Sequence, residues 1–143
     1  MDSTRRVSIK ALVLDETRTK FLVMKQAEEL DGGVWDLPGG GLIWGSDPQI
    51  DLPREIEEEM GIVVTEIAKK PSYFFTFEKK AIDGTVFWVA NVAYETMLES
   101  LDFKPSDECV ALRFVTPEEV LELDVIPGVH VLAKMFDPKN HLK

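Results

Sequence analysis

The stretch REIEEEMG, residues 54–61, places four glutamates within eight positions. At about 100° of rotation per residue, Glu55, Glu58 and Glu59 fall on one face of a helix, and the apolar side chains form a second, inward-packing face. No lysine lies four residues beyond Glu58 or Glu59 to pair with it. Because like charges repel and hard cations such as Mg²⁺ prefer clustered carboxylates, the stretch predicts a helix with a metal-binding face.

The ends of this helix are marked by residues with special backbone properties. Gly61 is expected to end it, because glycine adopts the left-handed conformation readily. Asp51 is the predicted N-cap, which places Pro53 in the first turn, where proline is tolerated. The alternative is a first turn at Asp47-Pro48 with a kink at Pro53.

Glycines precede the predicted helix. Residues 38–41 read PGGG, and glycine allows a phosphate or a metal ion to approach the main chain closely. A triple glycine alone is weak evidence for a site. Its combination with the carboxylate face predicts that Gly40 and Gly41 contact a ligand.

Length and charge limit the classes of function. With 143 residues, the chain is expected to form a single domain, residues 1–143. No apolar run reaches the eighteen residues of a membrane span, and Cys109 is the only cysteine, so we expect a soluble, cytoplasmic protein. The formal charge of −10 opposes binding to nucleic acid.

Most of the other elements are predicted to be strands. Residues 6–14 and 20–26 are expected to pair, and residues 72–80 and 85–98 to form a hairpin around Asp83-Gly84. A short strand is expected to run into the glycine-rich loop, and further elements are a strand at 111–115, a capped helix at 116–123 and a helix at 128–136.

The spacing of these residues resembles the signature of the Nudix hydrolases: glycine, five residues, glutamate, seven residues, then Arg-Glu, an aliphatic, any residue, Glu-Glu, any residue, glycine and an aliphatic. Eight of the nine fixed positions match, from Gly40 to Ile62. The ninth is Ser46, where the family has glutamate, and Pro53 directly before the Arg-Glu pair is a second departure.

This resemblance implies an α+β fold with a mixed β-sheet sandwiched between α-helices, as in the Nudix fold. It also implies Mg²⁺ as the cofactor, with Mn²⁺ as an alternative, held by Glu58, Glu59 and the Gly40 carbonyl. Glu55 is either a further metal ligand or the general base, and the sequence does not separate these roles. Arg54 is expected to orient one of the box glutamates.

The resemblance further predicts a small substrate, a nucleoside diphosphate linked to another group. Nucleoside triphosphate cleavage to monophosphate and pyrophosphate is the leading reaction, with Lys25 and Glu108 as further candidate contacts. The alternative is a Nudix-fold nucleotide-binding or regulatory domain with weak or no catalysis, which Ser46 favours. A 5′-end RNA pyrophosphohydrolase is disfavoured by the negative charge, and a homodimer is left open.

Overall fold

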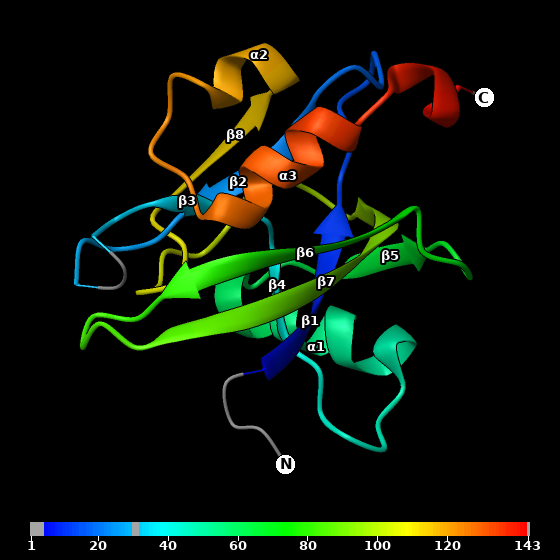
Figure 1. Cartoon of the computed structure of the whole chain (residues 1–143). Helices are drawn as coiled ribbons and strands as arrows, with labels where there is room; N and C mark the ends of the chain where they lie inside the picture. Colours follow the sequence, from blue (N-terminus) through cyan, green and yellow to red (C-terminus); the bar gives the residue numbers. More distant parts are fainter. Residues whose placement is uncertain (1–4, 30–31, 143) are drawn as a thin grey trace.

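The computed structural model describes residues 5–29 and 32–142, and Figure 1 shows their arrangement. In chain order the elements are β1 (Arg5–Leu12), β2 (Phe21–Lys25), β3 (Trp35–Asp36), β4 (Gly39–Gly41), α1 (Pro48–Met60), β5 (Val64–Ile67), β6 (Tyr73–Lys80), β7 (Val86–Leu98), β8 (Ala111–Val115), α2 (Pro117–Val120), α3 (Pro127–Met135) and a 3₁₀ turn, Pro138–His141. Across these ranges, none of the helices has the length and apolar character that crossing a bilayer demands.

The strands form two sheets. The larger has the order β4-β1-β7-β5, with β6 also paired to β7, and the smaller has the order β3-β2-β8. The pairing of β1 with β7 is parallel, whereas the other pairings are antiparallel. The predicted hairpin of β6 and β7, the short strand into the glycines, the strand β8 and the helices α2 and α3 are confirmed.

One predicted pairing is wrong. The strands expected at 6–14 and 20–26 belong to different sheets, and they meet only near the turn that joins them. There, Leu14 and Phe21 form an isolated bridge, and the Leu22 amide donates to the Val13 carbonyl. Neighbouring β-rich segments suggested a hairpin, but the partners of β1 lie much farther along the chain, where no local pattern reveals them.

Helices cover both sides of the larger sheet, as the predicted sandwich requires (Figure 1). Alternation along β6 buries Tyr73, Phe75 and Phe77 in one apolar cluster, which also contains Val129 and Leu132 of α3. A second cluster joins Ile9 of β1 to three buried side chains of α1; these are Leu52, Ile56 and Met60. The apolar face of α1 therefore fixes the direction in which its carboxylates point.

The helix α1 begins earlier than predicted. Asp47, not Asp51, is the N-cap: its backbone is extended and its side chain accepts a hydrogen bond from the Gln49 amide at 2.9 Å. Pro53 consequently lies inside the helix, as in the alternative interpretation. The prediction that Gly61 ends the helix is confirmed, because its φ is 66° and its amide bonds to the Glu57 carbonyl.

Candidate active site

The glycine strand β4 lies directly against two glutamates of α1. The Gly39 amide donates to Oε1 of Glu59 at 3.0 Å. A Cβ atom on Gly40 would lie 2.6 Å from the carboxyl carbon of Glu55, and one on Gly39 would lie 2.1 Å from the Ile9 carbonyl oxygen. The absence of side chains on these glycines therefore makes room for the carboxylates and for the neighbouring strand.

Glu59 is buried, with only 5% of its surface exposed. Burial is the main cause that raises its pKa from 4.5 to about 9, and Glu108 raises it further through a hydrogen bond and its charge. The charge of Lys10 and the amide of Gly39 act in the opposite direction. Lys10 is itself buried and donates to Asp36 at 3.2 Å. An interior cation therefore offsets part of the negative charge.

Arg54 contacts three carboxylates. Its Nη1 lies 3.1 Å from Oε1 of Glu58, and its Nη2 lies 3.3 Å from Glu55 and 3.7 Å from Asp51. The Glu58 side chain is 59% exposed. Glu55 is partly buried, and its pKa is raised mainly by that burial, with further increases from the charges of Glu58 and Glu108. Arg54 thus contacts two of the predicted box glutamates, Glu55 and Glu58, and its role in orienting them stays a prediction.

The loop before β8 brings Glu108 to this region. The Ser106 hydroxyl donates to the Glu59 carbonyl at 2.7 Å, and it accepts the Glu108 amide at 3.3 Å. The other side of the loop is joined to the end of β2, where the Val110 amide donates to the Lys25 carbonyl. Glu108 therefore lies within electrostatic reach of Glu55 and Glu59, and Lys25 borders the same loop.

The donor chemistry of the site fits a hard divalent cation. A buried carboxylate with a raised pKa lacks counter-charge, and carboxylate and backbone carbonyl oxygens are the ligands that such cations prefer. Within residues 5–29 and 32–142, no three His, Cys, Asp or Glu side chains are already gathered as a metal site. Glu58 pairs with Arg54 instead. The ligand set of Gly40, Glu55, Glu58 and Glu59 stays a prediction.

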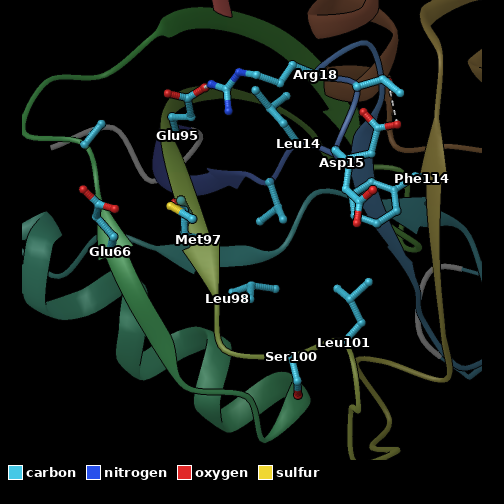
Figure 2. Close-up of a pocket in the computed structure, with 15 residues that line it drawn as sticks. Leu14, Asp15, Arg18, Glu66, Glu95, Met97, Leu98, Ser100, Leu101 and Phe114 are labelled. Atoms are coloured by element: carbon cyan, nitrogen blue, oxygen red, sulfur yellow. Dashed lines mark hydrogen bonds and ion pairs between the residues drawn. The ribbon is translucent and has the colours of Figure 1, made fainter. Parts of the chain in front are cut away.

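A cavity of about 870 Å³ lies elsewhere. Its lining comes from the turn between β1 and β2, from β5, and from the end of β7, with Glu95, Met97 and Leu98 among the lining residues (Figure 2). Of the described residues that line it, none belongs to α1 or β4. The cavity is therefore separate from the carboxylates that lie between the helix and the glycine strand.

Two charged residues of this region were missed as site residues. Lys10 interrupts an otherwise apolar strand, and this interruption was the available signal for a buried function. Asp51 was interpreted only as a helix cap, yet it is buried and lies beside Arg54. Its role depends on the fold of residues 42–47, which no periodic pattern predicts.

Comparisons with known proteins agree with the resemblance found in the sequence. The family model described as the NUDIX domain matches residues 4–135. A "MutT-like protein" of Streptomyces ambofaciens is 31% identical over 94% of this chain and 85% of its own length. An "8-oxo-dGTP diphosphatase" of Proteus vulgaris is 28% identical over 62% of this chain and 80% of its own length.

Other relatives are longer than this chain. Two from Mycobacterium tuberculosis are 32% identical over 68% of the chain, which spans only 44% of their length. Among solved structures, a MutT protein from Methanosarcina mazei Go1 has a TM-score of 0.68 at 23% identity, covering 98% of each chain. That likeness concerns the fold, and it agrees with the mixed sheet between helices described above.

Proposed function

The chain belongs to the Nudix family, and from that premise we propose that it hydrolyses the diphosphate linkage of a nucleoside diphosphate joined to another group. The observation that carries this proposal is the approach of Glu55 and Glu59 to the backbone of Gly39 and Gly40. Helix carboxylates held against a glycine main chain can bring a cation and a diphosphate together.

The residues of the chain would divide the chemistry among them. Glu58, Glu59 and the Gly40 carbonyl would hold Mg²⁺ or Mn²⁺, which neutralises diphosphate charge and orients the attacking water when bound. Lys10 limits the negative charge around Glu59. Glu55 is the candidate base, because burial raises its pKa toward the working range of a general base.

Other residues would position the substrate and the glutamates. Arg54 holds the box carboxylates, and the open backbone at Gly41 leaves room for phosphate oxygens. Glu108 lies in the loop before β8, and Lys25 lies at the end of β2, to which that loop is hydrogen-bonded. We assign both to the substrate side of the site. Glu108 also raises the pKa of Glu59. We therefore assign it a second role, an influence on proton transfer.

A nucleoside triphosphate, cleaved to monophosphate and pyrophosphate, is the proposed substrate. The Proteus vulgaris relative, named an 8-oxo-dGTP diphosphatase, supports this class. The net charge of −10 favours a small nucleotide with its own cation over a polynucleotide, which needs a basic surface. We also propose a cytoplasmic location, where such nucleotides are found.

The test is a panel of nucleoside triphosphates, 8-oxo-dGTP, ADP-ribose and dinucleoside polyphosphates with Mg²⁺ or Mn²⁺. Glu58→Gln should lower turnover by more than about 100-fold, because losing a residue that would hold the cation directly should cost more than losing a hydrogen-bond partner of a ligand. Glu57→Gln is the matched control, because Glu57 is exposed on the same helix. Wild-type turnover no greater than that of Glu58→Gln would contradict the proposal, and nucleotide binding without turnover would support the regulatory alternative.

A further inference from the structure

Arg54 has one carboxylate partner that is not assigned to the metal. Its contacts with Glu55 and Glu58 involve groups that the proposed function engages in catalysis, whereas Asp51 stands outside that set. When Glu58 holds a cation and Glu55 acts as the base, both carboxylates would be drawn away from the guanidinium, which the cation would also repel. Asp51 is then the acidic partner that remains beside Arg54.

Asp51 is suited to this role because it is fixed in place. Its side chain is 4% exposed, its Oδ1 accepts the Ser46 hydroxyl at 2.7 Å, and its Oδ2 lies 3.5 Å from the Ile43 amide. The Nη2 atom of Arg54 is buried and makes no hydrogen bond with any described residue. At 3.7 Å from Oδ1 of Asp51, it needs only a small movement to form one.

We propose that Asp51 is a positioning residue that replaces the missing box glutamate: its carboxylate, held by Ser46, keeps Arg54 in place while the helix glutamates serve the reaction. This inference rests on the proposed function of the site. It also explains why serine is compatible with position 46. A glutamate there beside Asp51 would bring two like charges together, whereas the serine hydroxyl donates to the carboxylate.

The geometry allows a glutamate carboxylate at position 46 to replace the carboxylate of Asp51. The Cγ atom of a glutamate at position 46 takes the place of the serine Oγ, and its carboxylate oxygens lie two bonds farther. The Oδ1 atom of Asp51 lies 2.7 Å from Ser46 Oγ, so removal of the Asp51 side chain vacates the space that this glutamate would fill. The same space can therefore hold one carboxylate, either from residue 51 of the helix or from a glutamate at position 46 of the loop.

The experiment compares Asp51→Asn, Asp51→Ala, Ser46→Glu and the double variant Ser46→Glu/Asp51→Ala. Mn²⁺ affinity is measured by calorimetry without nucleotide, and kcat and KM are measured with the best substrate of the panel. Each Asp51 single variant should weaken Mn²⁺ binding about 10-fold and lower kcat about 10-fold with KM little changed. The double variant should recover both to within about 3-fold of wild type.

Asp47→Asn is the matched control. It removes one charge from the start of the same helix, keeps a good N-cap residue, and lies outside the contacts of Arg54 described above. It should leave Mn²⁺ affinity and kcat unchanged. Melting temperatures of all variants identify any that fail to fold, and the nearly isosteric Asp51→Asn decides the question if the double variant is unstable.

The outcomes separate this inference from the proposed function. If the wild-type protein turns over substrate and the Asp51→Asn variant has the same Mn²⁺ affinity and kcat, the inference is overturned and the proposed function stands. A double variant that folds but is as impaired as Asp51→Ala would also overturn it. Absent turnover, together with Mn²⁺ affinity that depends on Asp51 and recovers in the double variant, would support the positioning role and reject the proposed function.

Discussion

The Glu59 carboxylate accepts a hydrogen bond from the Gly39 amide at 3.0 Å, so a buried acid of α1 is joined directly to β4. A buried carboxylate with one backbone donor and a lysine nearby is only partly compensated. The position of α1 on the sheet is therefore held by apolar packing, while ionisation of the buried Glu59 side chain opposes folding.

The first prediction concerns stability and pH at Glu59. Because its folded pKa of about 9 lies above the ordinary 4.5, its contribution to stability is full below about pH 4.5 and is lost as the pH rises to about 9. Glu59→Gln should therefore melt roughly 3–10 °C above wild type at pH 9 without metal, with a smaller gain at pH 5. Melting curves in a chelator across this range test it, and parallel pH profiles for the two proteins would contradict it.

The second prediction compares adjacent glycines. Gly40→Ala places a Cβ atom 2.6 Å from the carboxyl carbon of Glu55, which must move, whereas a Cβ on Gly41 meets nothing within 4 Å. Turnover should fall about 10-fold or more in Gly40→Ala, because a small misplacement of a catalytic group is costly. Both variants should retain most of their stability. Turnover of Gly40→Ala equal to that of wild type would show that the position of Glu55 is not critical.

The third prediction concerns Glu108, whose charge raises the pKa of both Glu55 and Glu59. Glu108→Gln should lower these pKa values and move the acidic limb of the kcat/KM profile to lower pH. The neighbouring exposed residue Asp107 provides the control variant Asp107→Asn. A pH profile of Glu108→Gln that coincides with wild type would remove Glu108 from the site.

The fourth prediction concerns Pro53, which lies inside α1. Proline cannot donate to the carbonyl four residues earlier, and its ring crowds that carbonyl, so Pro53→Ala should stabilise the protein by about 1–3 kcal/mol. Pro48→Ala is the control, because proline at the first helical position loses no helical bond. Urea denaturation of both variants measures the difference, and a loss of stability in Pro53→Ala would mean that the proline ring contributes needed packing.

Local patterns predicted the elements that local forces define. The face of α1, its end at Gly61 and the hairpin of β6 and β7 follow from side-chain periodicity and turn residues. The predicted start of α1 was wrong because Asp47 and Asp51 are both good capping residues. Which of them caps the helix depends on the burial of Asp51 against the loop. Side-chain periodicity does not contain that information.

The candidate site shows the same division. The spacing of the glutamates and of Gly40 was readable from the sequence, and the structure brings Glu55 and Glu59 beside the glycines. The contribution of Lys10 was not predicted, because its neighbour Asp36 comes from another strand of the fold. Sequence periodicity does not predict contacts between charged residues of distant segments. Such contacts determine the net charge around Glu59.

The parallel pairing of β1 with β7 has a consequence for how the molecule folds. Its partner residues are more than eighty positions apart, so closing that loop costs entropy before the contact stabilises anything. During synthesis, the glycine strand and the glutamate helix leave the ribosome well before β7 does. The central strand β7 of the larger sheet is therefore synthesised after the glycine strand and the glutamate helix. A nascent chain that stops short of β7 presents β1 with an unpaired edge that other chains can join.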